Sequence, residues 1–115
     1  MRERRRHQRY KVSENAFVFG AVHPGRITDI SLAGMSFSHI CDGELPETES
    51  LTILDSENQF FLEKVPCQTI ARVVELSGFP ASPLQVANVR VAFRLTSIQK
   101  VLLEAYIKTH AIGNA

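Results

Sequence analysis

Short stretches that alternate apolar and polar residues, separated by turn signals, run through most of this chain. Residues 35–39 (MSFSH) and 86–95 (VANVRVAFRL) place every second side chain on one face, which is the period of a half-buried β-strand. Residues 23–25 (HPG) and 77–83 (SGFPASP) carry the glycine and proline of turns. Strands at this spacing predict an all-β fold, either a small antiparallel barrel or a sandwich.

The period changes near the end of the chain. Thr96 and Gln99 have the spacing of a capping box, and apolar residues follow at helical intervals. We therefore expect a helix from Ser97 to about His110. Its apolar stripe is expected to close an open end or side of the barrel, which for such a stripe is a commoner role than forming a partner groove. The residues of this stripe are Ile98, Val101, Leu102, Ala105 and Tyr106.

The length of 115 residues suits one domain, which we place at residues 12–115, after a basic arm at residues 1–11. A hydrophobic content of 44% with 22% charged residues is that of a globular protein. There is no continuous apolar stretch of membrane-spanning length, and none follows the basic start as in a signal peptide. Cys41 and Cys67 make no disulfide framework, so we expect a cytoplasmic protein.

Charge is distributed unevenly along the chain. The first 11 residues hold five arginines and one lysine against one glutamate, a charge of +5, so the other 104 residues carry −4. This asymmetry favours an anionic partner for the arm, such as a nucleotide, a nucleic acid or a membrane surface. A solvated basic tail is the alternative that charge alone leaves open.

Two short motifs stand out together. Arg5 and Arg9 form an RxxxR just before the first predicted strand, and Asp29, Ser31 and Gly34 form a DxSxxG in the next hairpin. With the β-rich body and the C-terminal helix, these motifs resemble the PilZ domain family over essentially the whole chain. The resemblance implies a six-stranded antiparallel β-barrel with a C-terminal helix, and a receptor for the bacterial second messenger cyclic di-GMP.

The resemblance also implies the roles of particular residues. The two arginines of RxxxR would bind phosphate and guanine, and the DxSxxG residues would bind the other side of the ligand. An arginine directly before RxxxR accompanies binding of a self-intercalated ligand pair. The implied binding residues are Arg4, Arg5, Arg9, Asp29, Ser31 and Gly34.

The chemistry of these residue types agrees with that role. Guanidinium groups bind phosphate oxygens, donate to the O6 and N7 atoms of guanine, and stack on bases. The Asp29 carboxylate can accept from the N1–H and N2–H groups of guanine, while Ser31 is small and supplies one hydroxyl. Gly34 is expected to take a positive φ at the corner and to let the ligand approach the backbone.

One stretch departs from the family pattern. Members often carry a glycine in a G-x-x-F sequence of the last strand, whereas residues 88–93 (NVRVAF) contain none. The additional side chain either narrows the ligand pocket, or Arg90 reaches a phosphate.

Other constellations are weaker. No CxxC or HxxxH spacing pairs Cys41, Cys67, His23 and His39 into a metal site. A triad of Ser31, His39 and Asp29 lacks a nucleophile elbow, so we expect neither an enzyme nor a cofactor.

The function predicted from the sequence is a stand-alone receptor for cyclic di-GMP. The ligand would order the arm and thereby change contacts with a downstream protein partner. The alternative is a PilZ-like protein-interaction module that binds the ligand weakly or not at all. A nucleic-acid binder ranks last, because the body beyond the arm is acidic.

Overall fold

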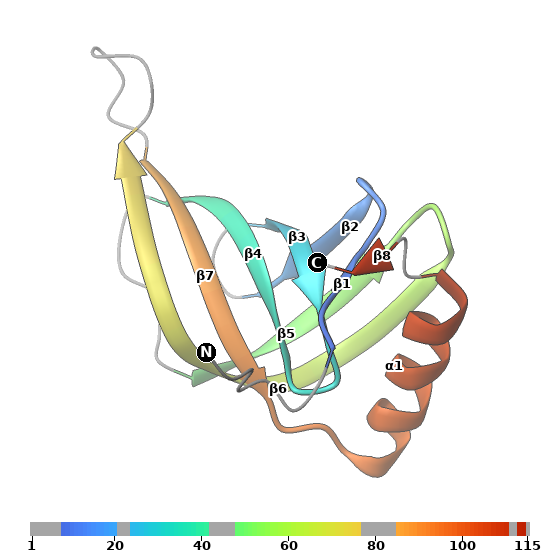
Figure 1. The fold of residues 1–115 in the computed structure, drawn as a ribbon. Helices are drawn as coiled ribbons and strands as arrows, with labels where there is room; N and C mark the ends of the chain where they lie inside the picture. Colours follow the sequence, from blue (N-terminus) through green and yellow to red (C-terminus); the bar gives the residue numbers. More distant parts are fainter. Residues whose placement is uncertain (1–7, 21–23, 42–47, 77–84, 111–112, 115) are drawn as a thin grey trace, which may run out of the picture.

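The structure, a computed structural model, describes residues 8–20, 24–41, 48–76, 85–110 and 113–114. These residues form eight β-strands and one α-helix (Figure 1). In chain order the elements are β1 (Tyr10–Lys11), β2 (Ala16–Phe19), β3 (Gly25–Ile30), β4 (Gly34–Cys41), β5 (Thr48–Asp55), β6 (Phe60–Leu76), β7 (Gln85–Phe93), α1 (Ser97–His110) and β8 (Gly113–Asn114).

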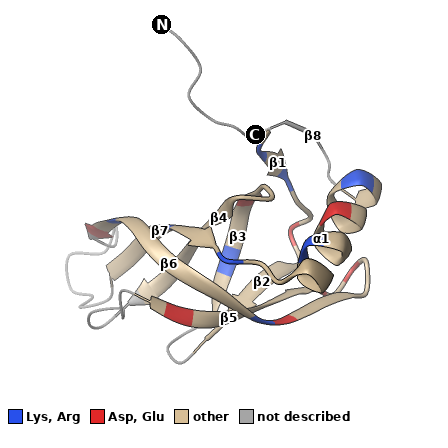
Figure 2. Cartoon of the chain, turned by 90° about the horizontal axis from the view of Figure 1, so that it is seen from below, with Lys and Arg blue, Asp and Glu red and all other residues tan. Residues whose placement is uncertain are grey.

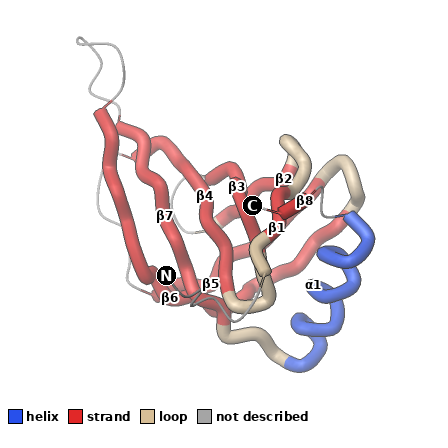
Figure 3. The backbone as a smooth tube through the Cα atoms, in the orientation of Figure 1, coloured by secondary structure: helices blue, strands red, loops and turns tan. Residues whose placement is uncertain are grey.

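Six of these strands close into an antiparallel barrel. Their hydrogen-bonded order is β2–β5–β6–β7–β4–β3, and β2 also pairs with β3, which completes the ring. The first residues of β3 pair with β2, whereas its last residue, Ile30, pairs with Tyr10 of β1. Strand β8 pairs with β1 on the outside (Figure 3). The prediction of a six-stranded barrel with a C-terminal helix is confirmed, with two short strands added.

Alternate apolar side chains of the strands fill the barrel interior. Met35, Phe37 and His39 of β4 share the buried face that the sequence pattern predicts for them. On the neighbouring β7, Val91 lies opposite Met35 and Val89 lies opposite Phe37. The buried core consists of Ala16, Val18, Ile27, Ile30, Met35, Phe37, Leu51, Ile53, Leu62, Val65, Cys67, Ala87, Val89, Val91, Leu103 and Tyr106.

Strand β6 is longer than the alternation pattern indicates. The pattern predicts strand near residues 60–62 and again from Cys67 to Leu76, whereas β6 runs without a break over both. Its first half pairs with β5 and its second half with β7. Lys64 takes a left-handed φ of 51°, and the register with β7 shifts between Thr69 and Ala71. Such irregularities bend a strand, which allows β6 to pair with β5 along its first half and with β7 along its second.

The capping box at the start of α1 is confirmed. Gln99 N donates to Thr96 Oγ1 at 3.2 Å, and Thr96 N donates to Gln99 Oε1 at 3.0 Å. Gln99 Nε2 also donates to the carbonyl oxygens of Glu63 and Lys64, at 3.0 and 3.2 Å. The same side chain therefore caps the helix and holds its first turn against β6.

The helix lies outside the barrel (Figure 2). It packs on the barrel through two buried side chains. Leu103 joins the core, and the Tyr106 ring stacks on Phe60, with ring centroids 4.1 Å apart. The Tyr106 hydroxyl donates to Asp55 Oδ2 at 2.6 Å.

The expectation that the apolar stripe of the helix packs on the barrel is largely wrong. Ile98, Val101 and Leu102 are 73%, 66% and 46% exposed, and Ala105 is exposed too. Of the predicted stripe only Tyr106 is buried. The helix has two overlapping apolar stripes that share Tyr106, and the stripe that also includes Leu103 faces the barrel.

Candidate ligand-binding face

The corner between β3 and β4 is held by Ser31. Its backbone N–H donates to Gly34 O at 2.8 Å, and its Oγ accepts from the N–H groups of Ala33 and Gly34 at 3.1 and 3.3 Å. Ser31 Oγ lies 3.4 Å from Gly34 O, to which it donates. The corner thus occupies the bonding capacity of this buried hydroxyl. Ser31 contributes to the site by fixing the shape of the corner.

Gly34 is required by close packing of strands. A Cβ atom at this position would overlap the carbonyl oxygen of Val91 on β7. The expectation of a positive φ is wrong, since none of the glycines in the described ranges has one. Glycine is needed here so that β4 and β7 can approach each other. The backbone that comes close to Gly34 is therefore that of β7.

A β-bulge sets the direction of Asp29. Ile27 pairs with Phe37 and Asp29 pairs with Ser36, so Thr28 is an extra residue in β3. The bulge reverses the alternation, which leaves Asp29 on the outer face and Ile30 in the core. The Asp29 carboxylate is partly exposed and makes no hydrogen bond or ion pair with any residue in the described part of the chain.

Asp29 belongs to a row of paired residues that crosses three strands. Asp29 of β3 lies opposite Ser36 of β4, and Ser36 lies opposite Arg90 of β7. Directly paired residues project from the same face of a sheet. All three side chains therefore lie on the outer surface of the barrel, with the small serine between the carboxylate and the guanidinium.

The second arginine of RxxxR lies at the edge of this face. Arg9 precedes Tyr10, and Tyr10 pairs antiparallel with Ile30, the residue before Ser31. Two motifs that are 20 residues apart in sequence thus meet at the β3–β4 corner. Arg4 and Arg5 lie outside the described residues.

Positive charge dominates the outer face formed by β1, β3, β4 and β7. The charged residues of these strands are Lys11, Arg26, Asp29 and Arg90, which give a net charge of +2. Arg26 is 4.0 Å from the exposed Glu14, a pair that solvent screens strongly. Apart from Asp29, acidic residues of the strands and the helix lie for example on β5 and α1 (Figure 2). This face suits an anion that also carries donor groups for Asp29.

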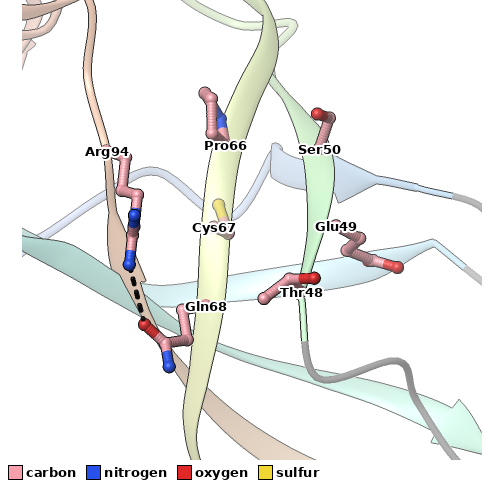
Figure 4. Close-up of a pocket in the computed structure, with 7 residues that line it drawn as sticks. All are labelled: Thr48, Glu49, Ser50, Pro66, Cys67, Gln68 and Arg94. Carbon is pink, nitrogen blue, oxygen red and sulfur yellow. Dashed lines mark hydrogen bonds between the residues drawn. The ribbon is translucent and has the colours of Figure 1, made fainter.

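A cleft of about 350 Å³ lies at the neighbouring strands β5 and β6 (Figure 4). Arg94 Nη2 donates to Gln68 Oε1 across it at 3.5 Å. Burial, with a smaller contribution from the negative charge of Glu49, raises the pKa of Cys67 to about 12. A thiol that stays protonated is a poor nucleophile and metal ligand. The cleft is lined by Thr48, Glu49, Ser50, Pro66, Cys67, Gln68 and Arg94.

Two further features bear on the sequence predictions. Among the described residues no group of three or more His, Cys, Asp or Glu side chains could hold a metal ion. No helix in the described ranges is long and apolar enough to cross a membrane.

Sequence reasoning did not place Ser36 or Lys11 near the motifs and left the role of Arg90 open. Lys11 is exposed and follows Tyr10 on β1, beside β3. Ser36 and Arg90 join the Asp29 row only through the pairing of β4 with β7. A local pattern carries no signal for such a register, because it depends on residues more than 50 positions apart.

Together, the fold and this face define a small closed β-barrel domain with Asp29 on one outer surface and Arg9 next to β1 at its edge. A model of the PilZ domain family matches residues 3–109. The chain belongs to the PilZ domain family.

Solved structures agree with this assignment. The PilZ domain of YcgR from Escherichia coli, solved with cyclic di-GMP, superposes with a TM-score of 0.70 at 15% identity, over 94% of this chain and 92% of that one. The cyclic di-GMP complex of MrkH from K. pneumonia gives a TM-score of 0.71 at 12% identity. That match covers 92% of this chain but 52% of the longer MrkH chain. At these identities the likeness establishes the fold. No curated protein sequence matches this chain.

Proposed function

We propose that this chain is a cytoplasmic receptor that binds cyclic di-GMP on the outer face of β1, β3, β4 and β7 and performs no chemistry on it. The observation that carries the proposal is the pairing of β1, which follows Arg9, with the end of β3 beside an outward-facing Asp29 that has no hydrogen bond or ion pair within the described ranges. The solved PilZ complexes with cyclic di-GMP support the choice of ligand.

The ligand offers two phosphates and two guanines, and the site residues divide between them. Asp29 accepts from the N1–H and N2–H groups of one guanine, which adenine lacks. Arg9, together with Arg5, binds phosphate and the acceptor edge of guanine. Ser31 and Gly34 keep the corner in the shape that presents Asp29. Arg4 binds a second, intercalated ligand molecule, so that two molecules bind per chain at high concentration.

Relay of the signal would follow from ordering of the basic arm. The positive residues of the arm, which has a net charge of +5, repel one another, and the anionic ligand reduces this repulsion. The arm then lies across the outer face, which changes the surface that a downstream protein partner meets.

Calorimetric titration tests the proposed ligand. We expect cyclic di-GMP to bind the parent protein with a stoichiometry of one or two. Asp29→Ala should weaken binding and reduce the preference over cyclic di-AMP. Glu14→Ala is the matched control, because it removes an acid that is 91% exposed and lies 4.0 Å from Arg26 of β3. If Asp29→Ala strengthened binding as Glu14→Ala does, the arm would attract anions by charge alone, and guanine recognition by Asp29 would be refuted.

Hydrogen exchange tests the relay. We expect amides of residues 2–9 to exchange fast without ligand and slowly with it, while residues 86–95 stay protected in both states. Protection of residues 2–9 in the free protein would exclude ordering on binding, even if the ligand bound.

A protein-interaction module is the second candidate function. The exposed Ile98, Val101 and Leu102 on α1 favour it, because three neighbouring large apolar side chains on one surface can form a contact with another protein. Absence of binding heat with cyclic di-GMP, for protein whose fold is intact, would favour this function over the receptor.

A further inference from the structure

We infer that Arg90 on β7 binds the phosphate of cyclic di-GMP that lies farthest from the basic arm. This inference rests on the proposed function and adds a cationic group on the opposite side of Asp29 from RxxxR. It is drawn from strand register, side-chain exposure and the charges of the outer face.

The strand order places Arg90 on the side of Asp29 that is opposite to Arg9. Strands β1, β3, β4 and β7 are consecutive neighbours in the sheet. Arg9 lies just before β1, Asp29 is on β3, and Arg90 is on β7. Asp29 therefore has one arginine on each side of it across the sheet.

The distance between Asp29 and Arg90 allows one ligand molecule to contact both side chains. Asp29 and Arg90 both pair with Ser36, so their Cα atoms are two strand spacings apart, about 9–10 Å. Both side chains project from the outer face, and the serine between them does not block the space above β4. A guanine held by Asp29 can thus extend its sugar and phosphate over β4 towards Arg90.

The symmetry of the ligand leaves a second phosphate for Arg90 to bind. Cyclic di-GMP has two equivalent phosphates on opposite sides of its ring. With one phosphate on the β1 side, next to Arg9, the other points away from β1. Arg90 is the one charged residue of β4 and β7, and it lies on their outer face. It is exposed and makes no hydrogen bond or ion pair within the described part of the chain, so its donors are free for the phosphate.

A charge series at position 90 tests this role by calorimetry with cyclic di-GMP. Arg90→Gln keeps most of the length but removes the charge, and we expect binding about tenfold to a hundredfold weaker. Arg90→Lys should recover part of the affinity, and Arg90→Glu should bind most weakly. Thermal melting of each variant should match the parent, because the side chain is exposed.

Arg94→Gln is the matched control. It removes the same charge just beyond the end of β7, where the Arg94 guanidinium donates to Gln68. The affinity of this variant for cyclic di-GMP should stay within about twofold of the parent, because the charge is exposed and lies away from the proposed contact. An equal loss in Arg94→Gln would overturn the proposal, because overall charge and not position would then decide affinity. Tighter binding by Arg90→Ala would overturn it too, since the side chain would then obstruct the ligand.

The same titrations separate this inference from the proposed function. If the parent binds and the Arg90 variants bind equally well, the receptor function stands and the role of Arg90 is refuted. If neither the parent nor any variant binds, both are refuted. If only the Arg90→Ala variant binds, the parent is not a receptor and Arg90 is the obstruction.

Discussion

Tyr106 in the C-terminal helix donates a 2.6 Å hydrogen bond to the carboxylate of Asp55, which lies at the end of β5 and is 0% exposed. The same carboxylate accepts from Ser13 Oγ at 3.0 Å and from Asn58 Nδ2 at 2.8 Å. Ser13 lies between β1 and β2. One buried charge therefore connects the start of the barrel, the β5–β6 turn and the helix, and its hydrogen bonds compensate for the loss of hydration.

Removing the hydroxyl should weaken this connection without removing the ring. We expect Tyr106→Phe to lower the free energy of unfolding by about 2 kcal/mol, since a buried hydrogen bond to a charged group is lost. Urea denaturation measures the change. A change below about 0.5 kcal/mol, the usual size for a surface substitution, would show that the bond contributes little.

Stability should fall in acid through Asp55. Burial acts to raise the pKa of Asp55, but the hydrogen bonds from Tyr106, Asn58 and Ser13 outweigh it, and the pKa lies below the ordinary 3.8. A lowered pKa stabilises the folded state above pH 3.8, and that contribution is lost as the pH falls through the pKa of the folded protein. Unfolding free energy measured between pH 7 and pH 2 should therefore decline more steeply for the parent than for Asp55→Asn.

Two adjacent leucines test the orientation of the helix. Leu103 is 0% exposed and Leu102 is 46% exposed. We expect Leu103→Ala to cost about 3 kcal/mol, through a cavity, and Leu102→Ala about 1 kcal/mol or less. Chemical denaturation of both variants compares them directly. Equal losses would mean that the helix presents another face to the barrel.

Gly34→Ala should destabilise the barrel independently of any ligand. The new methyl group would overlap the Val91 carbonyl oxygen, and neither backbone can move without disturbing the β4–β7 ladder. We expect a loss of about 3 kcal/mol by thermal or urea unfolding. Ala33→Ser, at the exposed neighbouring position of the corner, is the control and should remain close to the parent.

Arg9→Ala should reduce affinity for cyclic di-GMP about tenfold to a hundredfold, because one charge-assisted contact is lost. Arg9 precedes the first strand, so the free energy of unfolding should change by less than about 1 kcal/mol. Calorimetry and urea denaturation of the same preparation separate the two effects. Parental affinity in Arg9→Ala would contradict the assignment of RxxxR.

Local patterns were sufficient for much of the fold. The capping box at Thr96 and Gln99 and the buried face of β4 follow from spacing, and both are observed. The face of the helix does not follow, because apolar residues occupy positions on two overlapping stripes. Both stripes include Tyr106, whose partner Asp55 is 51 residues away in sequence, so spacing within the helix does not choose between them.

The sequence motifs name candidate site residues, but the positions of the described ones in the fold do not follow from the motifs. Asp29 faces outward because of a bulge at Thr28. The sequence has no glycine or proline there that would indicate a bulge. Gly34 is needed for the approach of β7, a contact that local turn rules do not contain. Arg90 joins the Asp29 row through the register of β4 and β7, which long-range pairing determines.

The pairing of β1 with β8 has a mechanical consequence. Tyr10 lies opposite Asn114 and Lys11 lies opposite Gly113, so the chain leaves both strands at the same end of the ladder. Tension between those two exits would load the hydrogen bonds one pair at a time, as in opening a zipper, whereas shear would load them together. A force that pulls the two exits apart would therefore separate β8 from β1, the strand next to Arg9, before it opens the six-stranded barrel.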